Sequence, residues 1–341
     1  MSRFSTLPVE ERRLLIDQVA ARRGVVPVIV EKDFWVCWTL ARIFSTPGIA
    51  PHVVFKGGTS LSKVFGVIDR FSEDIDLSVA PASLGFPEAE LDEAPSASQR
   101  GKRMQALAEQ CEARVREHFL PAMERAIESA LGPAPRDAHW LAFEVDPQAG
   151  TPNLRFSYPS VLPQPGGYVA KQVKLEFGAL TRQQPTGRYT INPMLAAILG
   201  DDDDDFVADV VALELARTFW EKATILHAEY HRPPDKAIRD RFARHYADFA
   251  ALWRHASRPQ SLERKDLLED VVLHKSRYFA SSWANYDTAR AGSFRLVPPR
   301  YRCAALAQDY DVMRPMFLTE PPSFDKVLTQ LAEAERELNA S

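Results

Sequence analysis

The stretch from His52 to Val79, HVVFKGGTSLSKVFGVIDRFSEDIDLSV, decides how the rest of the chain is interpreted. Its first part is a short apolar run followed by two consecutive glycines, Gly57 and Gly58. Glycines directly after a strand indicate a sharp turn in which the backbone comes close to another group. Residues 60–65 then predict a short helix, and a glycine-rich turn before a helix N-terminus presents free N–H groups that suit phosphate.

The second part of this stretch, residues 72–79, has the alternation of a half-buried strand. Asp74, Asp76 and Ser78 face one way. The apolar residues that alternate with them are Ile75, Leu77 and Val79. The two aspartates are roughly 7 Å apart at Cα on one face, so both reach a single hard cation such as Mg²⁺. An exposed edge strand is the alternative explanation, and the G-x-x-x-x-G-K-[ST] pattern of a P-loop is absent.

The order of Gly-Gly-Thr-Ser, a short helix and an Asp-x-Asp strand resembles the first motif of the DNA polymerase β-like nucleotidyltransferase superfamily. With Lys63, Arg70 and Ser72 between its halves, this version is similar to the AbiEii/AbiGii-type nucleotidyltransferase toxin family. The resemblance implies an α+β fold. A nucleotidyltransferase domain with a mixed sheet is expected at residues 1–185 and a helical C-terminal domain at residues 186–341, with the nucleotide in the cleft between them.

Length and composition agree with such a protein. The chain has 341 residues, which predicts two domains, and it is 45% hydrophobic and 26% charged. Its net charge of -4 argues against a broad basic surface that holds nucleic acid. Residues 231–265, however, contain nine Lys or Arg against four Asp or Glu. This local excess either receives a triphosphate or an RNA end, or is a solvated helical face balanced by acids elsewhere.

The cysteines and the apolar runs bear on location. Three scattered cysteines, Cys37, Cys111 and Cys303, predict a reducing cytoplasm and argue against a disulfide framework or a zinc site. The N-terminal sequence MSRFSTLPVEERRLL has no apolar signal-peptide region. No stretch approaches the roughly 18 apolar residues of a membrane span. We therefore expect a cytoplasmic protein with no membrane segment.

Helical and strand periodicity place the motif within a larger domain. The predicted helices are 8–23, 28–44, 100–131, 206–230 and 235–254, and the predicted strands of an antiparallel extension are 140–145, 154–158 and 168–177. Pro121 is expected to kink the long helix. The five aspartates at 201–205 are expected to form a solvated loop before the next helix. Glu31, Lys32 and Asp33 match a family pattern and are expected to pair with the Gly-Gly loop.

Glu176 is the candidate for a third carboxylate. It lies in the last predicted strand, where it alternates with Leu175 and Phe177. The superfamily places a third acid on a neighbouring strand, where it helps to hold the metal near the acceptor hydroxyl. The resemblance therefore implies this role for Glu176, although several relatives have Asp there. The alternative is an exposed glutamate opposite Lys174.

Lys222 is the candidate for a cation that neutralises phosphate. It falls in an apolar stripe of the helix predicted at 206–230, so its side chain either snorkels or projects into a cleft. Glu221 and Lys222 match a Glu-Lys pair of the family, whose lysine is expected to neutralise the triphosphate. Further along the chain, Lys275 and Arg295 are candidates for phosphate or acceptor contacts.

A second polar cluster is predicted on the helix at 235–254. Its apolar face contains Phe242, Tyr246, Phe249 and Trp253. The residues of the other face, at i, i+3, i+4 and i+7, are Arg241, Arg244, His245 and Asp248. This order matches the final motif of the family, which implies contacts with the nucleotide. The alternative is an ion-pair network that stabilises the helix.

The resemblance thus implies a nucleotidyltransferase that transfers a nucleoside monophosphate from an NTP and releases pyrophosphate. The implied catalytic residues are Asp74, Asp76, Glu176 and Lys222, of which the three acids hold Mg²⁺. The implied nucleotide-binding residues are Gly57, Gly58, Thr59, Ser60, Lys63, Ser72, Arg241, Arg244, His245 and Asp248.

The family further implies a toxin of a type IV toxin–antitoxin system, paired with a winged-helix antitoxin encoded nearby. The expected acceptor is RNA, such as the 3′ end of tRNA. Three alternatives stay open at this point: transfer to a small-molecule or protein hydroxyl, a nucleotide-binding module without catalysis, and a Mg²⁺-dependent nuclease that uses the same carboxylates.

Overall fold

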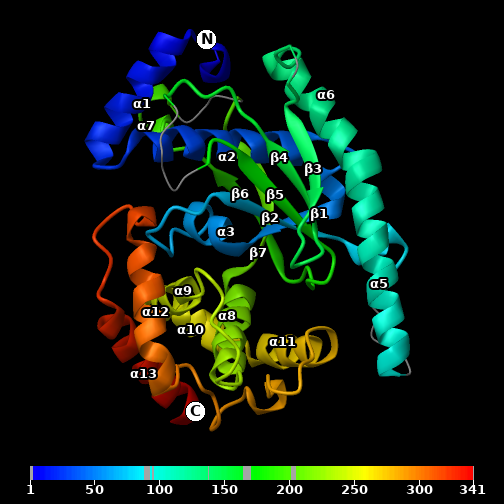
Figure 1. Cartoon of the computed structure of the whole chain (residues 1–341), viewed down its shortest axis with the longest axis vertical. Coiled ribbons are helices and arrows are strands. Elements are labelled where there is room, and N and C mark those ends of the chain that lie inside the picture. Colours follow the sequence, from blue (N-terminus) through cyan, green and yellow to red (C-terminus); the bar gives the residue numbers. More distant parts are fainter. Residues whose placement is uncertain are drawn as a thin grey trace. The chain divides into compact units, whose positions relative to one another are not determined.

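A computed structural model describes residues 3–87, 93, 96–136, 138–163, 170–200 and 205–340. The chain forms two compact units (Figure 1). The first, here the sheet unit, comprises Met1–Val64 and Ser72–Ala212. The second, the helical unit, comprises Phe65–Phe71 and Leu213–Ser341. The boundary differs from the one predicted after residue 185, because two further strands beyond that point join the sheet.

The sheet unit is built on a seven-stranded mixed sheet with the order β3-β4-β5-β2-β1-β7-β6. Its strands are β1 (Val53–Lys56), β2 (Asp74–Val79), β3 (Leu141–Val145), β4 (Pro152–Phe156), β5 (Val173–Gly178), β6 (Thr186–Ile191) and β7 (Ala208–Leu213). The pairs β1–β2, β3–β4 and β4–β5 are antiparallel, whereas β2–β5 and β1–β7 are parallel. The predicted mixed sheet and the antiparallel extension are both confirmed.

Helices cover this sheet. They are α1 (Val9–Arg23), α2 (Pro27–Ser45), α3 (Gly57–Lys63), α5 (Ala97–Arg114), α6 (Leu120–Leu131) and α7 (Ala196–Leu199), with 3-10 turns at Phe4–Thr6, Ala50–His52 and Pro81–Leu84. Helix α2 lies across the sheet and contacts β2 and β5, and α6 contacts β3 (Figure 1). A π-helical turn at Val115–Phe119 separates α5 from α6. Pro121 is the second residue of α6, and a proline without a backbone N–H favours such an interruption.

The core of the sheet unit lies between α2 and the apolar side of the strands. Ile75, Leu77 and Val79 are fully buried, which confirms the predicted alternation of β2. Trp38 of α2 stacks on Phe156 of β4 with 5.5 Å between ring centroids. Large aromatic rings contribute much of the buried area of a core, so α2 is firmly fixed to the sheet.

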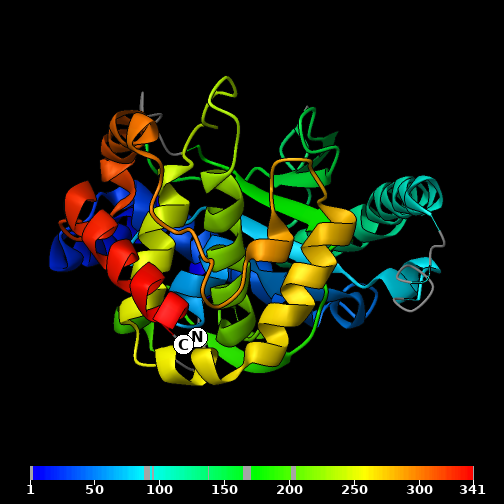
Figure 2. The same ribbon diagram turned by 90° about the horizontal axis from the view of Figure 1, so that it is seen from below.

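The helical unit is organised around α8. Its helices are α8 (Leu215–Tyr230), α9 (Ala243–Arg254), α10 (Arg258–Glu263), α11 (Lys265–Tyr278), α12 (Arg300–Val312) and α13 (Phe324–Ala340), with 3-10 turns at Tyr286–Thr288 and Arg314–Met316. Figure 2 shows α8 flanked by α11 on one side and by α9 on the other, in agreement with its contacts. The apolar residues predicted for α9 are all buried: Phe242, Tyr246, Phe249 and Trp253.

The predicted helix at 206–230 is wrong in its first part. Residues 208–213 form β7, which pairs in parallel with β1 through Phe55 and Ala212. The predicted solvated loop at 201–205 is wrong for Asp205, and residues 201–204 lie outside the described residues. Asp205 is buried and accepts hydrogen bonds from Trp38 Nε1 at 3.1 Å and Arg42 Nη2 at 2.7 Å. These donors replace the solvation that a carboxylate loses on burial.

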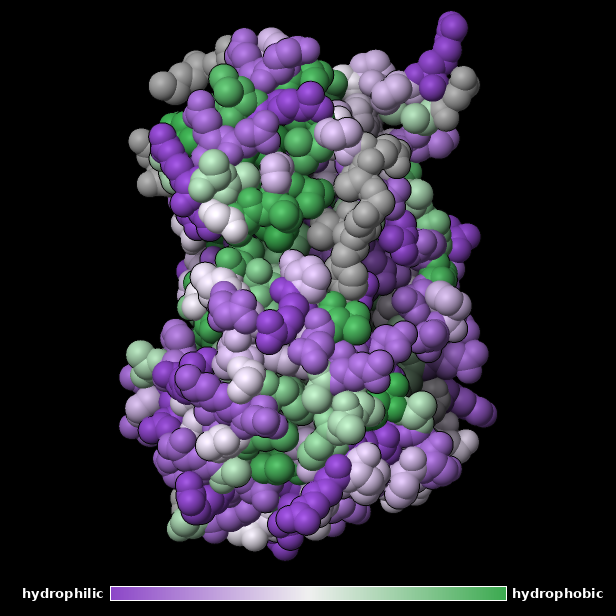
Figure 3. All heavy atoms as spheres, turned by 60° about the vertical axis from the view of Figure 1, so that its left-hand side comes forward, coloured by the Kyte–Doolittle hydropathy of each residue, from purple (hydrophilic) through white to green (hydrophobic). Residues whose placement is uncertain are grey.

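Two broad predictions about the whole chain can also be compared with the structure. The three cysteines are free thiols, as predicted. Across the described residues, no helix combines the length and the apolar character needed to cross a membrane. Figure 3 shows hydrophilic residues interspersed with apolar areas over the face in view.

Candidate active site

The glycine turn of the motif is shaped around an aspartate. Gly57 begins α3 directly after β1 and has a φ of 82°, a left-handed conformation that favours glycine. A Cβ added at this position would lie 1.9 Å from Asp76 Oδ2. The predicted close approach of the backbone is therefore an approach to the carboxylate of β2, and glycine is needed for both its conformation and its size.

The hydroxyls that follow the turn hold it against β2. Thr59 Oγ1 donates to the backbone carbonyl of Asp74, and Ser60 Oγ donates to the carbonyl of Gly57 at 2.9 Å. Both side chains are buried. The two predicted phosphate ligands thus use their hydroxyls within the turn. Ser72 lies in the segment that leads into β2.

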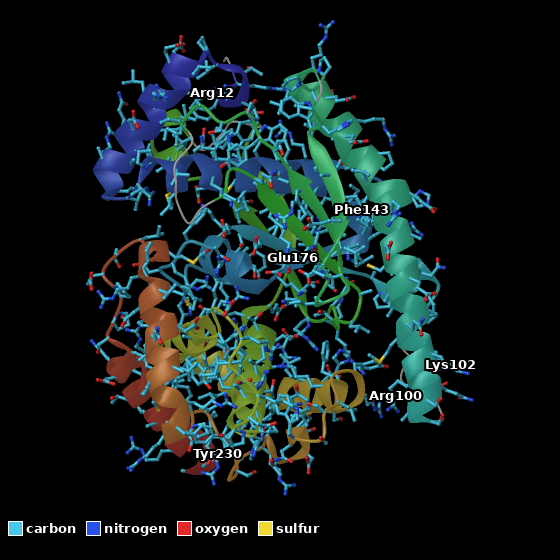
Figure 4. The ribbon with its side chains drawn as sticks, viewed as in Figure 1. Arg12, Arg100, Lys102, Phe143, Glu176 and Tyr230 are labelled. Atoms are coloured by element: carbon cyan, nitrogen blue, oxygen red, sulfur yellow. The ribbon has the colours of Figure 1, made fainter. Side chains whose placement is uncertain are left out.

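Three carboxylates come together on one side of the sheet. Asp76 of β2 is directly opposite Glu176 of the parallel neighbour β5, and Asp74 is opposite Lys174. Because side chains alternate along a strand, Asp74, Asp76 and Glu176 share one face. Glu176 is labelled on its strand in Figure 4. The third acid therefore does lie on a strand next to the Asp-x-Asp pair.

Crowded acids dominate the electrostatics of this group, and Lys174 and Arg155 place positive charge beside them. Burial, together with the charges of Glu176 and Asp76, raises the pKa of Asp74 to about 6. Lys174 Nζ donates to Glu176 Oε1 and lies 3.6 Å from Asp146 Oδ2. Glu176 is thus in register with Asp76 and pairs with Lys174, and its role as a metal ligand stays a prediction.

The fit of this group to a divalent cation rests on donor chemistry and register. Carboxylate oxygens are the donors that Mg²⁺ prefers, and the acids repel one another without a cation. Within the described part of the chain, no three Asp, Glu, His or Cys side chains converge closely enough to hold a metal as they stand. Glu176 points to Lys174 instead. Asp74, Asp76 and Glu176 have the donor chemistry and the shared face that a divalent cation needs, and they stay the predicted ligands.

A second group of charged residues lies in the helical unit, centred on Asp248 of α9. Arg70 donates to both oxygens of Asp248, at 2.8 Å from Nε and 2.9 Å from Nη2. Lys222 Nζ of α8 donates to Asp248 Oδ2 at 2.7 Å and lies 3.1 Å from His245 Nδ1. Arg244 adds a further positive charge to this group. With three cations to one carboxylate, the group is net positive and suits an anionic ligand.

The protonation states follow from burial. Burial lowers the pKa of Lys222, and burial followed by the charge of Lys222 holds the pKa of His245 well below its ordinary value. The His245 ring is therefore neutral. Arg70 and Lys222 outweigh burial at Asp248 and keep the pKa of its carboxyl below the ordinary value. Lys222 thus does not snorkel towards solvent. Its side chain points to Asp248 within the helical unit and forms part of an ion-pair network.

The structure places other predicted residues differently. The predicted helix at 235–254 begins only at Ala243, so Arg241 does not share the helical face of Arg244 and His245. Arg241 has a φ of 59°, and its N–H donates to Asp309 Oδ1 at 2.7 Å. The same carboxylate accepts from the Ala243 N–H at 2.7 Å, so a residue remote in sequence sets where the helix begins, which local periodicity could not predict.

Three further lysine and arginine candidates have structural partners. Lys63 Nζ pairs with Asp33. Lys275 Nζ donates to the Glu221 carbonyl and to Thr224 Oγ1, both at 2.8 Å, and burial lowers its pKa to about 8. Arg295 is half exposed and lies 3.7 Å from a carboxylate oxygen of Glu335. The contacts named for all three lie within their own unit.

Arg70 is the residue whose role sequence reasoning missed. It was part of the family resemblance but was not predicted as a site residue. It lies between the two halves of the motif, and the backbone around it pairs with residues 316–318, through Phe71 N to Met316 O at 2.6 Å and Leu318 N to Asp69 O at 3.2 Å. The available signal was a single cation in an otherwise mainly apolar run, FGVIDRF.

Comparison with known proteins identifies the family. Residues 38–330 match the family described as "Nucleotidyl transferase AbiEii toxin, Type IV TA system". The chain belongs to the AbiEii nucleotidyltransferase toxin family. It is accordingly a nucleotidyltransferase toxin of a type IV toxin–antitoxin system, with an NTP as substrate and an antitoxin as partner.

Two further comparisons were made with solved structures and with curated proteins. MenT4, a nucleotidyltransferase toxin from Mycobacterium tuberculosis H37Rv, has a solved structure that is similar to it. The two are 17% identical, the match covers 96% of this chain and 97% of that chain, and the TM-score is 0.40. Among curated proteins, no match was found.

We predict that Gly57→Ala disrupts the site more than backbone strain alone explains. The new Cβ would collide with the Asp76 carboxylate and displace it. Gly24→Ala is the matched control, since Gly24 has a φ of 67° but nothing within 4 Å of an added Cβ. Nucleotidyl transfer should fall by about tenfold or more in the first variant and stay near wild type in the second. Equal activity in both would contradict the proposed contact.

We also predict that Asp248→Ala strongly destabilises the protein. It leaves Arg70 and Lys222 buried without their carboxylate, which typically costs about 3–5 kcal/mol. Asp266→Ala is the control, because its pair with Arg264 is solvent-exposed and its loss should change the free energy of unfolding little. Urea unfolding of the two variants measures the difference. Similar losses in both would show that Asp248 is not the centre of the cluster.

Proposed function

We propose that this AbiEii-family chain carries out Mg²⁺-dependent transfer of a nucleoside monophosphate from an NTP to an acceptor hydroxyl. The observation that carries the proposal is the register of Asp76 with Glu176, with Asp74 on the same face and the Gly57 turn packed against Asp76. These positions support the proposal, because three hard oxygen donors would lie beside a turn whose free N–H groups suit phosphate. The acceptor hydroxyl loses its proton to solvent and its oxygen bonds to the α-phosphorus, while the bond from that phosphorus to the bridging β-phosphate oxygen breaks and pyrophosphate leaves with the electron pair.

In the sheet unit, the acids would bind the metal and the glycine turn would contact the phosphates. Asp74, Asp76 and Glu176 would hold Mg²⁺, which when bound offsets the charge of the phosphates. Lys174 would release Glu176 as the metal binds, since a divalent cation competes for the same oxygen. The backbone of Gly57 and Gly58 would contact the phosphates, with Thr59 and Ser60 keeping the turn in place. Lys63, at the end of α3, and Ser72, in the segment before β2, would help to bind the nucleotide.

The charged group of the helical unit would bind the nucleotide through its excess of positive charge. Lys222 and Arg244 are proposed to offset the triphosphate, which is the dominant electrostatic need in phosphoryl-group chemistry. Asp248 would hold Lys222 in position, and the neutral His245 ring would accept a hydrogen bond from it. Arg241, outside the helix, would contribute from the preceding turn.

The finer identity of the substrates and partners rests on the family resemblance. We propose RNA as the acceptor, for example the 3′ end of tRNA, and a winged-helix antitoxin encoded nearby. NTP and RNA as substrates imply action in the cytoplasm. The local basic excess in residues 231–265 supports an RNA acceptor. Small-molecule or protein acceptors and a non-catalytic nucleotide-binding role are the competing possibilities, and one experiment separates them.

We predict that Asp76→Asn abolishes transfer of label from α-³²P-NTP into RNA. Loss of one metal carboxylate should slow transfer by roughly a thousandfold, equivalent to several kcal/mol of lost charge stabilisation. Asp209→Asn is the control, because Asp209 is an exposed aspartate of β7 in the same sheet. Each labelled NTP is incubated with total RNA, protein and small-molecule fractions, and pyrophosphate release is measured in parallel.

Each outcome has a distinct meaning. Label in RNA with stoichiometric pyrophosphate supports the proposal, whereas label only in protein or in small molecules changes the acceptor. Shortened RNA without pyrophosphate would indicate a nuclease. Nucleotide binding with no transfer to any fraction, or an Asp76→Asn variant as active as wild type, would contradict the catalytic proposal.

A further inference from the structure

The first turns of α2 contain three consecutive buried charges that the proposed reaction does not use. Glu31, Lys32 and Asp33 are only 1%, 2% and 1% exposed. A buried charge is costly unless a partner or hydrogen bonds compensate it. Consecutive residues of a helix point in different directions, so each of these side chains reaches a different segment of the sheet unit.

Asp33 is tied to the first half of the motif. Its Oδ1 pairs with Lys63 Nζ, and its Oδ2 accepts a hydrogen bond from the backbone N–H of Met194 at 2.6 Å. Although burial acts in the opposite direction, the charge of Asp33 raises the pKa of Lys63. Lys63 is the last residue of α3, and α3 begins at Gly57, which packs against Asp76. The ion pair therefore fixes the far end of the short helix that contains the glycine turn.

Lys32 is tied to the second half of the motif. Its Nζ donates to Glu73 Oε2 at 2.5 Å and to the carbonyl of Ala170 at 2.8 Å. Glu73 directly precedes Asp74, the first residue of β2. Adjacent residues of one rigid helix thus hold the glycine turn and the start of the aspartate strand, although residues 64–73 separate these two pieces in the chain.

We propose that Lys32 and Asp33 are positioning residues that set the geometry of the carboxylate site. Acting through Glu73 and Lys63, they fix the start of β2, which contains Asp74, and the glycine turn that packs against Asp76. The inference rests on the proposed function, because it assumes that these aspartates bind a cation. Groups that orient metal ligands from behind typically change metal affinity by about 10–100-fold when they are removed.

Glu31 supplies a matched comparison. It lies on the same helix and is equally buried, but its partners belong to another segment. Its Oε2 accepts from Ser160 Oγ at 2.8 Å, and its Oε1 accepts from the Val161 N–H at 2.7 Å. A substitution at Glu31 therefore removes a buried charge from α2 without releasing either half of the motif.

The test is calorimetric titration of the full chain with Mn²⁺ alone, which reads cation affinity without turnover. We expect Lys32→Met and Asp33→Asn to weaken Mn²⁺ binding by about tenfold or more. The Mn²⁺ affinity of Glu31→Gln should stay within about twofold of wild type. This holds even if the melting temperature of Glu31→Gln falls as far as those of the Lys32 and Asp33 variants. Circular dichroism confirms that the compared proteins are folded. If Lys32→Met or Asp33→Asn does not fold, Lys32→Arg or Asp33→Glu replaces it, with a severalfold loss expected because its partner is displaced.

Two results would overturn the inference. One is wild-type Mn²⁺ affinity in folded Lys32 and Asp33 variants, which would make their ion pairs purely structural. The other is an equal loss in Glu31→Gln, which would make the effect a general consequence of removing a buried charge. Failure of the proposed function looks different, since wild type would then bind no Mn²⁺ or Asp76→Asn would bind it equally well.

Discussion

The sheet unit depends on holding like charges close together. The parallel pairing of β2 with β5 places Asp76 opposite Glu176, and the pleat puts Asp74 on the same face. The backbone ladder keeps these residues neighbours, and burial together with the neighbouring carboxylates raises the pKa of Asp74. Carboxylates held this close repel one another. The surrounding structure must therefore compensate their negative charge, either with its own cations or with a bound cation.

The surroundings of the acids can be understood from this constraint. Gly57 makes room for the Asp76 carboxylate where any side chain would collide with it. Lys174 neutralises Glu176 from the same strand. Behind the strands, the buried pairs made by Lys32 and Asp33 hold the two pieces of chain that carry the turn and the aspartates.

The helical unit has the opposite charge balance, with several cations around the carboxylate of Asp248. A nucleotidyltransferase needs both kinds of group, acids for a metal and cations for phosphates.

The sequence predicted what depends on local pattern. Alternation along residues 74–79 predicted a strand and its two faces, and the same alternation with the family resemblance led to Glu176. The pattern could not distinguish β7 from a helix, because the apolar run VADVVAL suits both and only its pairing with β1 decides. The ion-pair partners of buried charged side chains were the hardest feature to predict. Lys63 and Arg70 each pair with a carboxylate that is remote in sequence, Asp33 for the first and Asp248 for the second.

The central claim is that Asp74, Asp76 and Glu176 form one metal site for nucleotidyl transfer. The most direct measurement is a crystal structure with Mn²⁺ and a non-hydrolysable NTP, with the metal located by its anomalous scattering. The account predicts an anomalous peak at about 2.0–2.3 Å from oxygens of Asp74 and Asp76, with Glu176 released from Lys174. A nucleotide bound with its metal away from these aspartates would contradict it.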